Sequence, residues 1–304
     1  MKLSHRILPR NTLYDSSVSF DVSRPLAFMH VPKTSGVSMI QGLMATLTPT
    51  NVVTGFDGSL FLTDDDLNGI HESIRREIYG SCSALPKRAD LVAGHFAFAT
   101  LKGAYPHAQF LTILREPLSR LLSLWLYWRQ LTDIDLMPWG SLAERVRLSR
   151  RPLAEFLSEP TLAHQTDNVL LRMLLWPHPL IAQNQFLDPA HDRHLLRRAM
   201  AQLQQFDFVD FVENGKLADR LEKWLGCCFH HETRNETLAI PQPYRSPLKG
   251  ELTAQAYESL CDRCRVDLQL WTSVVAHIAP DCNIGMLRRH TVLANVSRYS
   301  VLMV

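Results

Sequence analysis

The segment LAFMHVPKTSGVS, residues 26–38, constrains the fold more than any other part of the chain. An apolar run stops at a Pro-Lys-Thr-Ser-Gly turn and apolar residues then recur at helical spacing, so residues 26–48 are predicted to form a strand, a loop and a helix. A helix N-terminus presents free N–H groups and the positive end of the helix dipole. We therefore expect this junction, with Lys33 and the N–H groups of residues 34–38, to bind a phosphate or a sulfate.

A second junction of the same kind lies in QFLTILREPLSRLLSLWLYWR, residues 109–129. Its short apolar start suits a buried parallel strand over 109–114, and Pro117 suits the first turn of the helix that follows. Arg115 comes directly after the strand, and Ser123 comes eight residues later on the helix. Both side chains can therefore reach one anionic group above the edge of the sheet.

Strands and helices alternate along the rest of the chain. This order, with anion-binding loops at strand ends, predicts an α/β fold: one P-loop-like domain with a mostly parallel sheet flanked by helices. Residues 131–200 are rich in proline, tryptophan and arginine, and we expect them to form a cover of short helices and loops over the site. The other expected elements are strands over 90–95 and 208–213, and helices over 66–79, 117–130, 216–225 and 252–278.

The chain divides into three segments on this pattern. Residues 1–25 are a lead-in, residues 26–280 the domain, and residues 281–304 a C-terminal extension. The extension ends in the apolar sequence SVLMV, which leaves three possibilities: an added strand, an oligomer contact or a disordered tail.

The composition is typical of a soluble globular protein, because 46% of the 304 residues are hydrophobic and 20% are charged. The formal net charge of +2 gives no global basic field, so no nucleic acid is expected as a partner. No apolar run approaches the ~18 residues of a membrane-spanning helix, and residues 1–23 lack the apolar core of a signal peptide. These features predict a cytoplasmic protein without a membrane span, or one whose N-terminal anchor has been removed.

Together the two junctions resemble the sulfotransferase superfamily, whose members use the sulfuryl donor 3′-phosphoadenosine 5′-phosphosulfate (PAPS). More narrowly, they are similar to the carbohydrate branch that includes the heparan sulfate O-sulfotransferases. The resemblance rests on PKT at 32–34 and LREP at 114–117, followed by Arg120 and Ser123. It extends over about residues 26–275 through Gly94-His95, Asn168 with Arg172, and residues 206–213 with Asn235 and Thr237.

The resemblance implies a role for each residue of the two junctions. Lys33 would neutralise charge on the departing 5′-phosphate, and Arg115 with Ser123 would bind the 3′-phosphate that distinguishes PAPS from ATP. Relatives often carry Gly-Gly-Thr where this chain has Ser-Gly-Val at 35–37, which affects the details of the loop but not its role. The residues that would cradle the phosphosulfate are Thr34, Ser35, Gly36, Val37 and Ser38.

His95, at the end of an expected strand, is the expected general base, because histidine titrates near neutral pH and relatives carry a base in a similar Gly-His segment. The alternative is a structural histidine held by hydrogen bonds. His30 is the next candidate, but we expect it to support the strand. Asn168 and Arg172 match a segment that lies along the acceptor cleft in relatives, although a helix N-cap and a structural ion pair explain them equally well.

The expected function is transfer of the sulfuryl group from PAPS to a hydroxyl of a carbohydrate or glycoconjugate, with 3′,5′-adenosine bisphosphate (PAP) as product and no metal. Sulfation of a tyrosyl protein, a lipid or a small alcohol is the alternative within the same chemistry. A P-loop kinase is disfavoured because GxxxxGK[ST] is absent: Lys33 precedes Gly36. A non-catalytic nucleotide-binding module would not require Lys33, Arg115, Ser123 and a base together.

The chain has six cysteines, which we expect to be buried thiols. One pair forms a CxxC motif, but it lies in a long helical pattern where both thiols can face the core. A zinc site is the alternative. Its ligands would come from Cys227, Cys228, His230, His231, Cys261 and Cys264.

Overall fold

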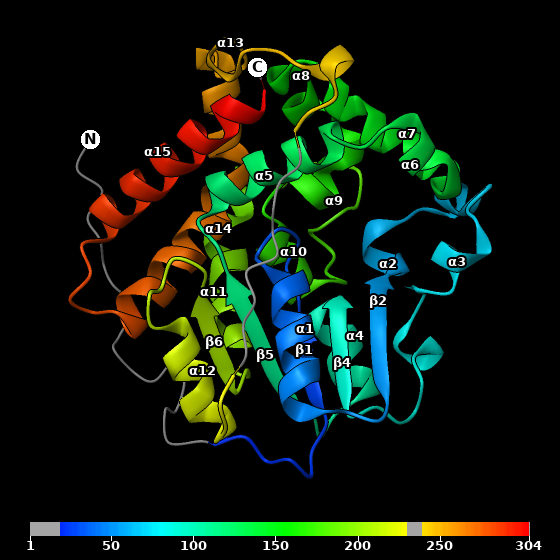
Figure 1. Cartoon of the computed structure of the whole chain (residues 1–304), viewed down its shortest axis with the longest axis vertical. Helices are drawn as coiled ribbons and strands as arrows, with labels where there is room; N and C mark the ends of the chain where they lie inside the picture. The colour runs from blue at the N-terminus through cyan, green and yellow to red at the C-terminus, as the bar shows by residue number, and fades with distance from the viewer. Residues whose placement is uncertain (1–18, 230–238, 304) are drawn as a thin grey trace.

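The computed structural model describes residues 19–229 and 239–303. Its centre is a sheet of six parallel strands in the order β3-β2-β4-β1-β5-β6, with helices on both faces (Figure 1). This arrangement confirms the predicted α/β fold, a single domain built on a parallel sheet. The strands are β1 (Leu26–Met29), β2 (Val52–Asp57), β3 (Ile78–Tyr79), β4 (Leu91–His95), β5 (Gln109–Leu114) and β6 (Phe208–Phe211).

Each face of the sheet is covered by its own helices, because alternate residues of a strand point to opposite faces. Leu26 and Phe28 of β1 point to one face, where α1 (Gly36–Leu47) and α12 (Leu217–Leu225) pack on them. Ala27 points to the opposite face. Burial on both sides explains why the central strands are continuous apolar runs. The helices on the second face are α4 (Phe98–Ala104), α10 (Val169–Leu175), α11 (Asp192–Leu203) and α14 (Ala254–Ile278).

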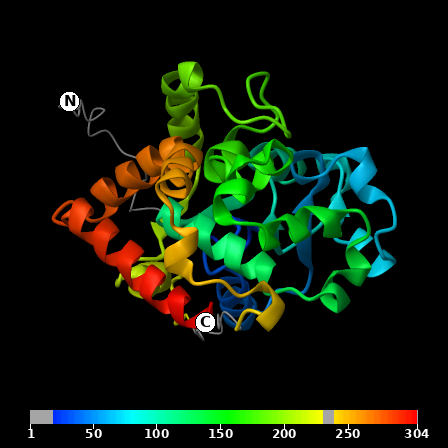
Figure 2. The same cartoon turned by 90° about the horizontal axis from the view of Figure 1, so that it is seen from above.

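A third group of helices lies over the carboxyl ends of the strands. Helix α5 (Pro117–Arg129) crosses above the sheet in Figure 1 and shares an apolar cluster with α8 (Leu153–Ser158), α14 and α15 (Ile284–Leu302). Seen from above, α15 lies along one edge of the molecule (Figure 2). No helix in the described ranges is both long and apolar enough to cross a membrane. The shorter helices are α2 (Gly58–Phe61), α3 (Glu72–Arg75), α6 (Asp133–Leu136), α7 (Leu142–Arg147), α9 (Ala163–Thr166) and α13 (Leu248–Glu251).

The chain connections diverge beside the central strand, which is where the ligand crevice of an open α/β sheet lies. The connection after β1 runs through α1 to β2 on one side, while the connection after β5 runs through α5 to β6 on the other. Because β1 and β5 are neighbours, their loops diverge at the carboxyl ends of the strands. Ligands of open α/β sheets bind at such a point, and it is here that the loop with Lys33 and the residue Arg115 lie.

The predicted helix over 66–79 is wrong. The structure has a 3₁₀ turn at Asp64–Leu67, then α3, then β3 at the edge of the sheet. Gly69 separates the first two with a φ of 71°, a left-handed conformation that interrupts a helix and that glycine adopts without strain.

The C-terminal extension is a docked helix, so neither the added strand nor the disordered tail is correct. Helix α15 begins where the Asn283 side chain accepts a hydrogen bond from the Met286 N–H, a normal N-cap. It packs against α5, where Tyr299 and Met303 are 1% exposed. The cover over 131–200 contains the expected short helices, α6 to α10, but α10 and α11 pack on the second face of the sheet.

Candidate active site

The loop between β1 and α1 has the shape of an anion-binding site. Lys33 and Ser35 adopt left-handed conformations, with φ of 68° and 62°, on either side of Thr34. Alternation of this kind turns successive N–H groups toward one concave side, a backbone nest that binds anions. The Thr34 hydroxyl donates to the Val31 carbonyl at 2.9 Å and so stabilises the loop. The nest leads directly into the N-terminus of α1, whose first N–H groups have no helical partner.

His30 explains why a glycine begins α1. A Cβ at Gly36 would lie 1.8 Å from Nε2 of His30, so the imidazole packs directly against the helix backbone. His30 is 7% exposed, and burial, together with the charges of His95 and Lys33, lowers its pKa well below the ordinary value. A neutral His30 therefore packs against the start of α1, whereas the sequence had suggested a support for the strand.

His95 lies at the end of β4 in an orientation suited to a base. Its Nδ1 is 2.7 Å from the carbonyl oxygen of His30. A carbonyl only accepts hydrogen bonds, so Nδ1 carries the hydrogen and Nε2 keeps its lone pair. Burial lowers the pKa of His95, the hydrogen bond to His30 opposes this shift, and the charge of Lys33 adds to it. His95 is therefore a neutral imidazole with a basic Nε2 near neutral pH.

Lys33 is a cation without a carboxylate partner. Its Nζ lies 3.9 Å from the centre of the Tyr127 ring, on α5. Burial and the nearby charge of Arg115 lower the pKa of Lys33 to about 8. Within the described part of the chain, no carboxylate lies within ion-pair distance of Nζ. The ammonium is therefore protonated near neutral pH and its charge is not compensated.

Arg115 is also held by neutral groups. Its Nη1 donates to the Lys33 carbonyl at 3.0 Å, and its Nη2 donates to Asn295 Oδ1 at 3.1 Å and to the Tyr299 hydroxyl at 3.2 Å. Both of the latter residues belong to α15. Ser123, the expected partner of Arg115, is buried two turns into α5, and no hydrogen bond joins the two side chains within the described residues.

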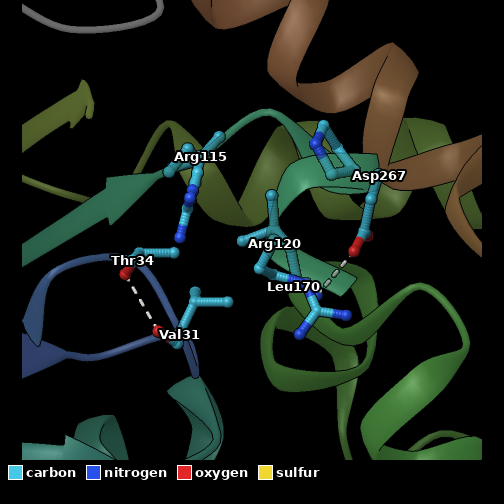
Figure 3. Close-up of a pocket in the computed structure, with 8 residues that line it drawn as sticks. Val31, Thr34, Arg115, Arg120, Leu170 and Asp267 are labelled. Atoms are coloured by element: carbon cyan, nitrogen blue, oxygen red, sulfur yellow. Dashed lines mark hydrogen bonds between the residues drawn. The ribbon is translucent and has the colours of Figure 1, made fainter. Parts of the chain in front are cut away.

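Arg120 adds a third positive charge behind the loop. It is 3% exposed, and its Nε and Nη1 have no hydrogen-bond partner in the described structure. Arg115 and Arg120, with Thr34 and Asp267, line a small cavity (Figure 3), whose volume of about 10 Å³ holds no more than one water-sized molecule. A nucleotide would therefore bind outside this cavity, on the open side of the loop.

The structure corrects the expectation for Asn168 and Arg172, because neither side chain reaches an open cleft. Arg172 is fully buried and donates to the Asp167 carboxylate and to three backbone carbonyls. Asn168, 1% exposed, accepts from the N–H groups of Val266 and Asp267. Asn168 thus ties the cover to α14, whereas the bonds of Arg172 stay within residues 167–185. Arg172 forms the structural ion pair that the sequence left open, and Asn168 is the N-cap residue of α10, although its side chain makes no cap hydrogen bond.

The cysteine cluster does not form a metal site among the residues that the structure describes. These contain no group of three or more His, Cys, Asp or Glu side chains that could hold an ion. Cys264 is buried, whereas Cys227 and Cys228 are exposed, contrary to the expectation of buried thiols throughout. His230, His231, Asn235 and Thr237 lie outside the described residues.

The structure thus brings Lys33, Arg115, His95 and the loop 34–38 together at the carboxyl ends of three neighbouring strands, and it leaves Asn168 and Arg172 elsewhere. No protein-family model matches the sequence, and a search of curated proteins finds no match. The functional interpretation therefore depends on this constellation.

Proposed function

We propose that this protein is a PAPS-dependent sulfotransferase that transfers a sulfuryl group to a hydroxyl of a carbohydrate or glycoconjugate. The observation that carries the proposal is the pairing of a backbone nest with two cations, Lys33 and Arg115, that have no carboxylate within ion-pair distance among the described residues; the buried Glu213 acts on Arg115 only from farther away. Buried or half-buried cations are stable only beside negative charge or strong acceptors. An anionic ligand at this crevice would supply a negative charge close to both groups, and a donor with phosphates at two positions could pair with both.

The residues of this crevice can meet each requirement of sulfuryl transfer. The acceptor oxygen attacks sulfur, the bond from sulfur to the 5′-phosphate oxygen breaks, and the hydroxyl proton passes to Nε2 of His95. Lys33 stabilises the charge that develops on the departing phosphate, and the nest binds the oxygens around it. Little covalent chemistry is required of the protein, so most of the rate enhancement comes from position and charge.

A second cavity supports the assignment of a carbohydrate acceptor. It has a volume of about 410 Å³ and lies beyond the ends of β2 and β3, next to the strand that carries His95. The hydroxyl-bearing residues Ser59 and Thr63 line it together with apolar groups, and Arg75 contributes a positive charge. This mixture suits a sugar that carries an acidic group.

Calorimetric titration with PAP and with ATP tests the proposal. We expect micromolar binding of PAP, much weaker binding of ATP, and loss of PAP binding in Lys33→Ala and Arg115→Ala. A preference for ATP would favour a kinase and contradict the proposal. If PAP binds, a screen with PAPS and hydroxyl acceptors follows: turnover of sugars, rather than of tyrosyl peptides, lipids or small alcohols, supports the carbohydrate assignment, and the absence of any turnover leaves a non-catalytic binding module.

A further inference from the structure

The partners of Arg115 distinguish it from three other buried or half-buried arginines, although Arg120 likewise has no carboxylate within ion-pair distance among the described residues. Arg172, Arg129 and Arg145 each pair with a carboxylate, at 2.8, 3.5 and 3.0 Å respectively. Arg115 has only neutral acceptors: a backbone carbonyl, an amide oxygen and a phenol oxygen. Hydrogen bonds to neutral acceptors fix the direction of a guanidinium without cancelling its charge.

Two of these acceptors come from a helix that is 180 residues away in the sequence. Arg288, Asn295 and Tyr299 are separated by seven and four residues, so they lie on one face of α15. Arg288 pairs with Glu116 at 3.3 Å, directly beside Arg115. Three side chains of α15 therefore dock on the junction between β5 and α5.

The two acceptors are themselves well held. The Asn295 amide donates to the Thr291 carbonyl at 3.0 Å, so its oxygen is the atom turned toward Arg115. Tyr299 is 1% exposed, so its ring is fixed by packing. Its hydroxyl accepts a hydrogen bond from Nη2 of Arg115.

We propose that α15 is part of the donor site, with Asn295 and Tyr299 as positioning residues that hold Arg115 through neutral oxygens and leave its charge to a phosphate of the donor. The inference rests on the proposed function and extends it to the C-terminal helix. A carboxylate in the position of Asn295 would hold Arg115 at least as firmly, but it would form an ion pair and neutralise the charge. The neutrality of this amide is therefore the property that matters.

The decisive variant is Asn295→Asp, which keeps the shape of the side chain and adds a negative charge. We expect it to bind PAP at least tenfold more weakly than the wild-type protein in calorimetry. Its melting temperature without ligand should be unchanged or higher, because the new carboxylate pairs with Arg115. Tyr299→Phe, which removes only the hydroxyl, should weaken PAP binding severalfold. Leu293→Ala, on the exposed side of α15, is the control and should bind PAP normally.

Each result supports or overturns the inference. A residue with a merely structural role would lower stability in Asn295→Asp without a separate loss of affinity. Unchanged or tighter PAP binding in Asn295→Asp or Tyr299→Phe overturns it. Tighter binding in Tyr299→Phe would mean that α15 competes with the anion for the two Nη2 hydrogens. If the wild-type protein does not bind PAP, the proposed function fails first, and this inference fails with it.

Discussion

The cations at the carboxyl ends of the strands and those in the cover are held in opposite ways. In the cover, Arg172 is fully buried, pairs with Asp167, and has its remaining donors on backbone carbonyls. At the strand ends, Lys33 rests on an aromatic ring and Arg115 on neutral oxygens. A charge in a close ion pair contributes to structure, whereas a charge without such a pair at the strand ends is the better candidate to bind a ligand.

Matched substitutions of one arginine in each region should separate these two roles with the largest effect. Arg172→Met leaves Asp167 buried without its closest partner, so we expect a loss of about 3–5 kcal/mol in the free energy of unfolding. Arg115→Met should lower that free energy less, by about 1–3 kcal/mol, because neutral acceptors lose a partner and no buried carboxylate loses its closest ion-pair partner. Urea denaturation measures both values.

The affinities for PAP should show the opposite order, with the larger loss in the Arg115 variant. Folded Arg172→Met should retain its affinity for PAP, and Arg115→Met should lose about tenfold to a hundredfold, the range for a hydrogen bond to a charged group. Equal stability losses in the two variants, or weakened PAP binding in both, would break the distinction between the regions.

Gly36→Ala should cause the next largest loss of stability, and the change lies in the anion-binding loop rather than in the cover. The new Cβ would overlap the buried His30 ring, so we expect a loss of about 1–3 kcal/mol in stability and loss of PAP binding as the first turn of α1 shifts. The double variant Gly36→Ala with His30→Ala removes the clash and should recover part of the stability. Additive losses in the double variant would show that His30 is not what excludes a side chain at 36.

The sequence predicted the two junctions well because their signals are local. The apolar run, the proline and the helical spacing around Arg115 all lie within one strand and one helix, and β5 and α5 have the expected boundaries to within one residue. The loop at Lys33 was found for the same reason. Its left-handed residues could not be predicted, because nothing in Pro-Lys-Thr-Ser-Gly requires a positive φ at lysine.

The errors arose where long-range contacts decide the structure. Asn295 and Tyr299 were missed because their role depends on the docking of α15 against a turn far away in the sequence. Arg172 was assigned to the acceptor cleft by resemblance, although its burial depends on backbone carbonyls that no motif identifies. The spacing of residues 288, 295 and 299 on one helical face was the available signal for α15.

A histidine of the cover provides a pH test of the same contrast. Burial, with the charges of Arg145 and Arg172, lowers the pKa of His164 to about 3 in the folded protein. Below pH 6.5, the ordinary pKa of histidine, His164 is protonated in the unfolded chain but stays neutral in the folded protein. Stability from this group is therefore complete above pH 6.5 and falls by about 1.4 kcal/mol per unit as pH decreases toward 3.

The contribution of His164 is best isolated by difference. Asp267, whose pKa burial raises to about 6, has the opposite sign and partly offsets His164 below pH 6. The free energy of unfolding of His164→Gln, measured in urea from pH 7 to 5, should decrease less steeply than that of the wild-type protein. Parallel curves would show that His164 is protonated in the folded protein and that the cover tolerates an extra charge.

The smallest expected effect concerns the ring that holds Lys33. A cation over an aromatic ring gains about 0.5–1 kcal/mol, which corresponds to roughly half a pH unit in the pKa of the ammonium. Arg115, His30 and His95 all lie near Lys33. Arg115 is positively charged and disfavours the protonated lysine, whereas the two histidines are neutral near pH 7. The Tyr127 ring, in contrast, favours the protonated form.

Titration of PAP affinity against pH should reveal this contribution. In the wild-type protein, affinity should fall above about pH 8, where Lys33 loses its proton. Tyr127→Leu should move that decline to lower pH, whereas Tyr127→Phe, which keeps the ring, should not. The control is Tyr257→Leu, an exposed tyrosine on α14. An equal shift in the Leu and Phe variants of Tyr127 would assign the effect to the hydroxyl. It would contradict the view that the aromatic ring stabilises the charge of Lys33, which has no carboxylate partner within ion-pair distance among the described residues.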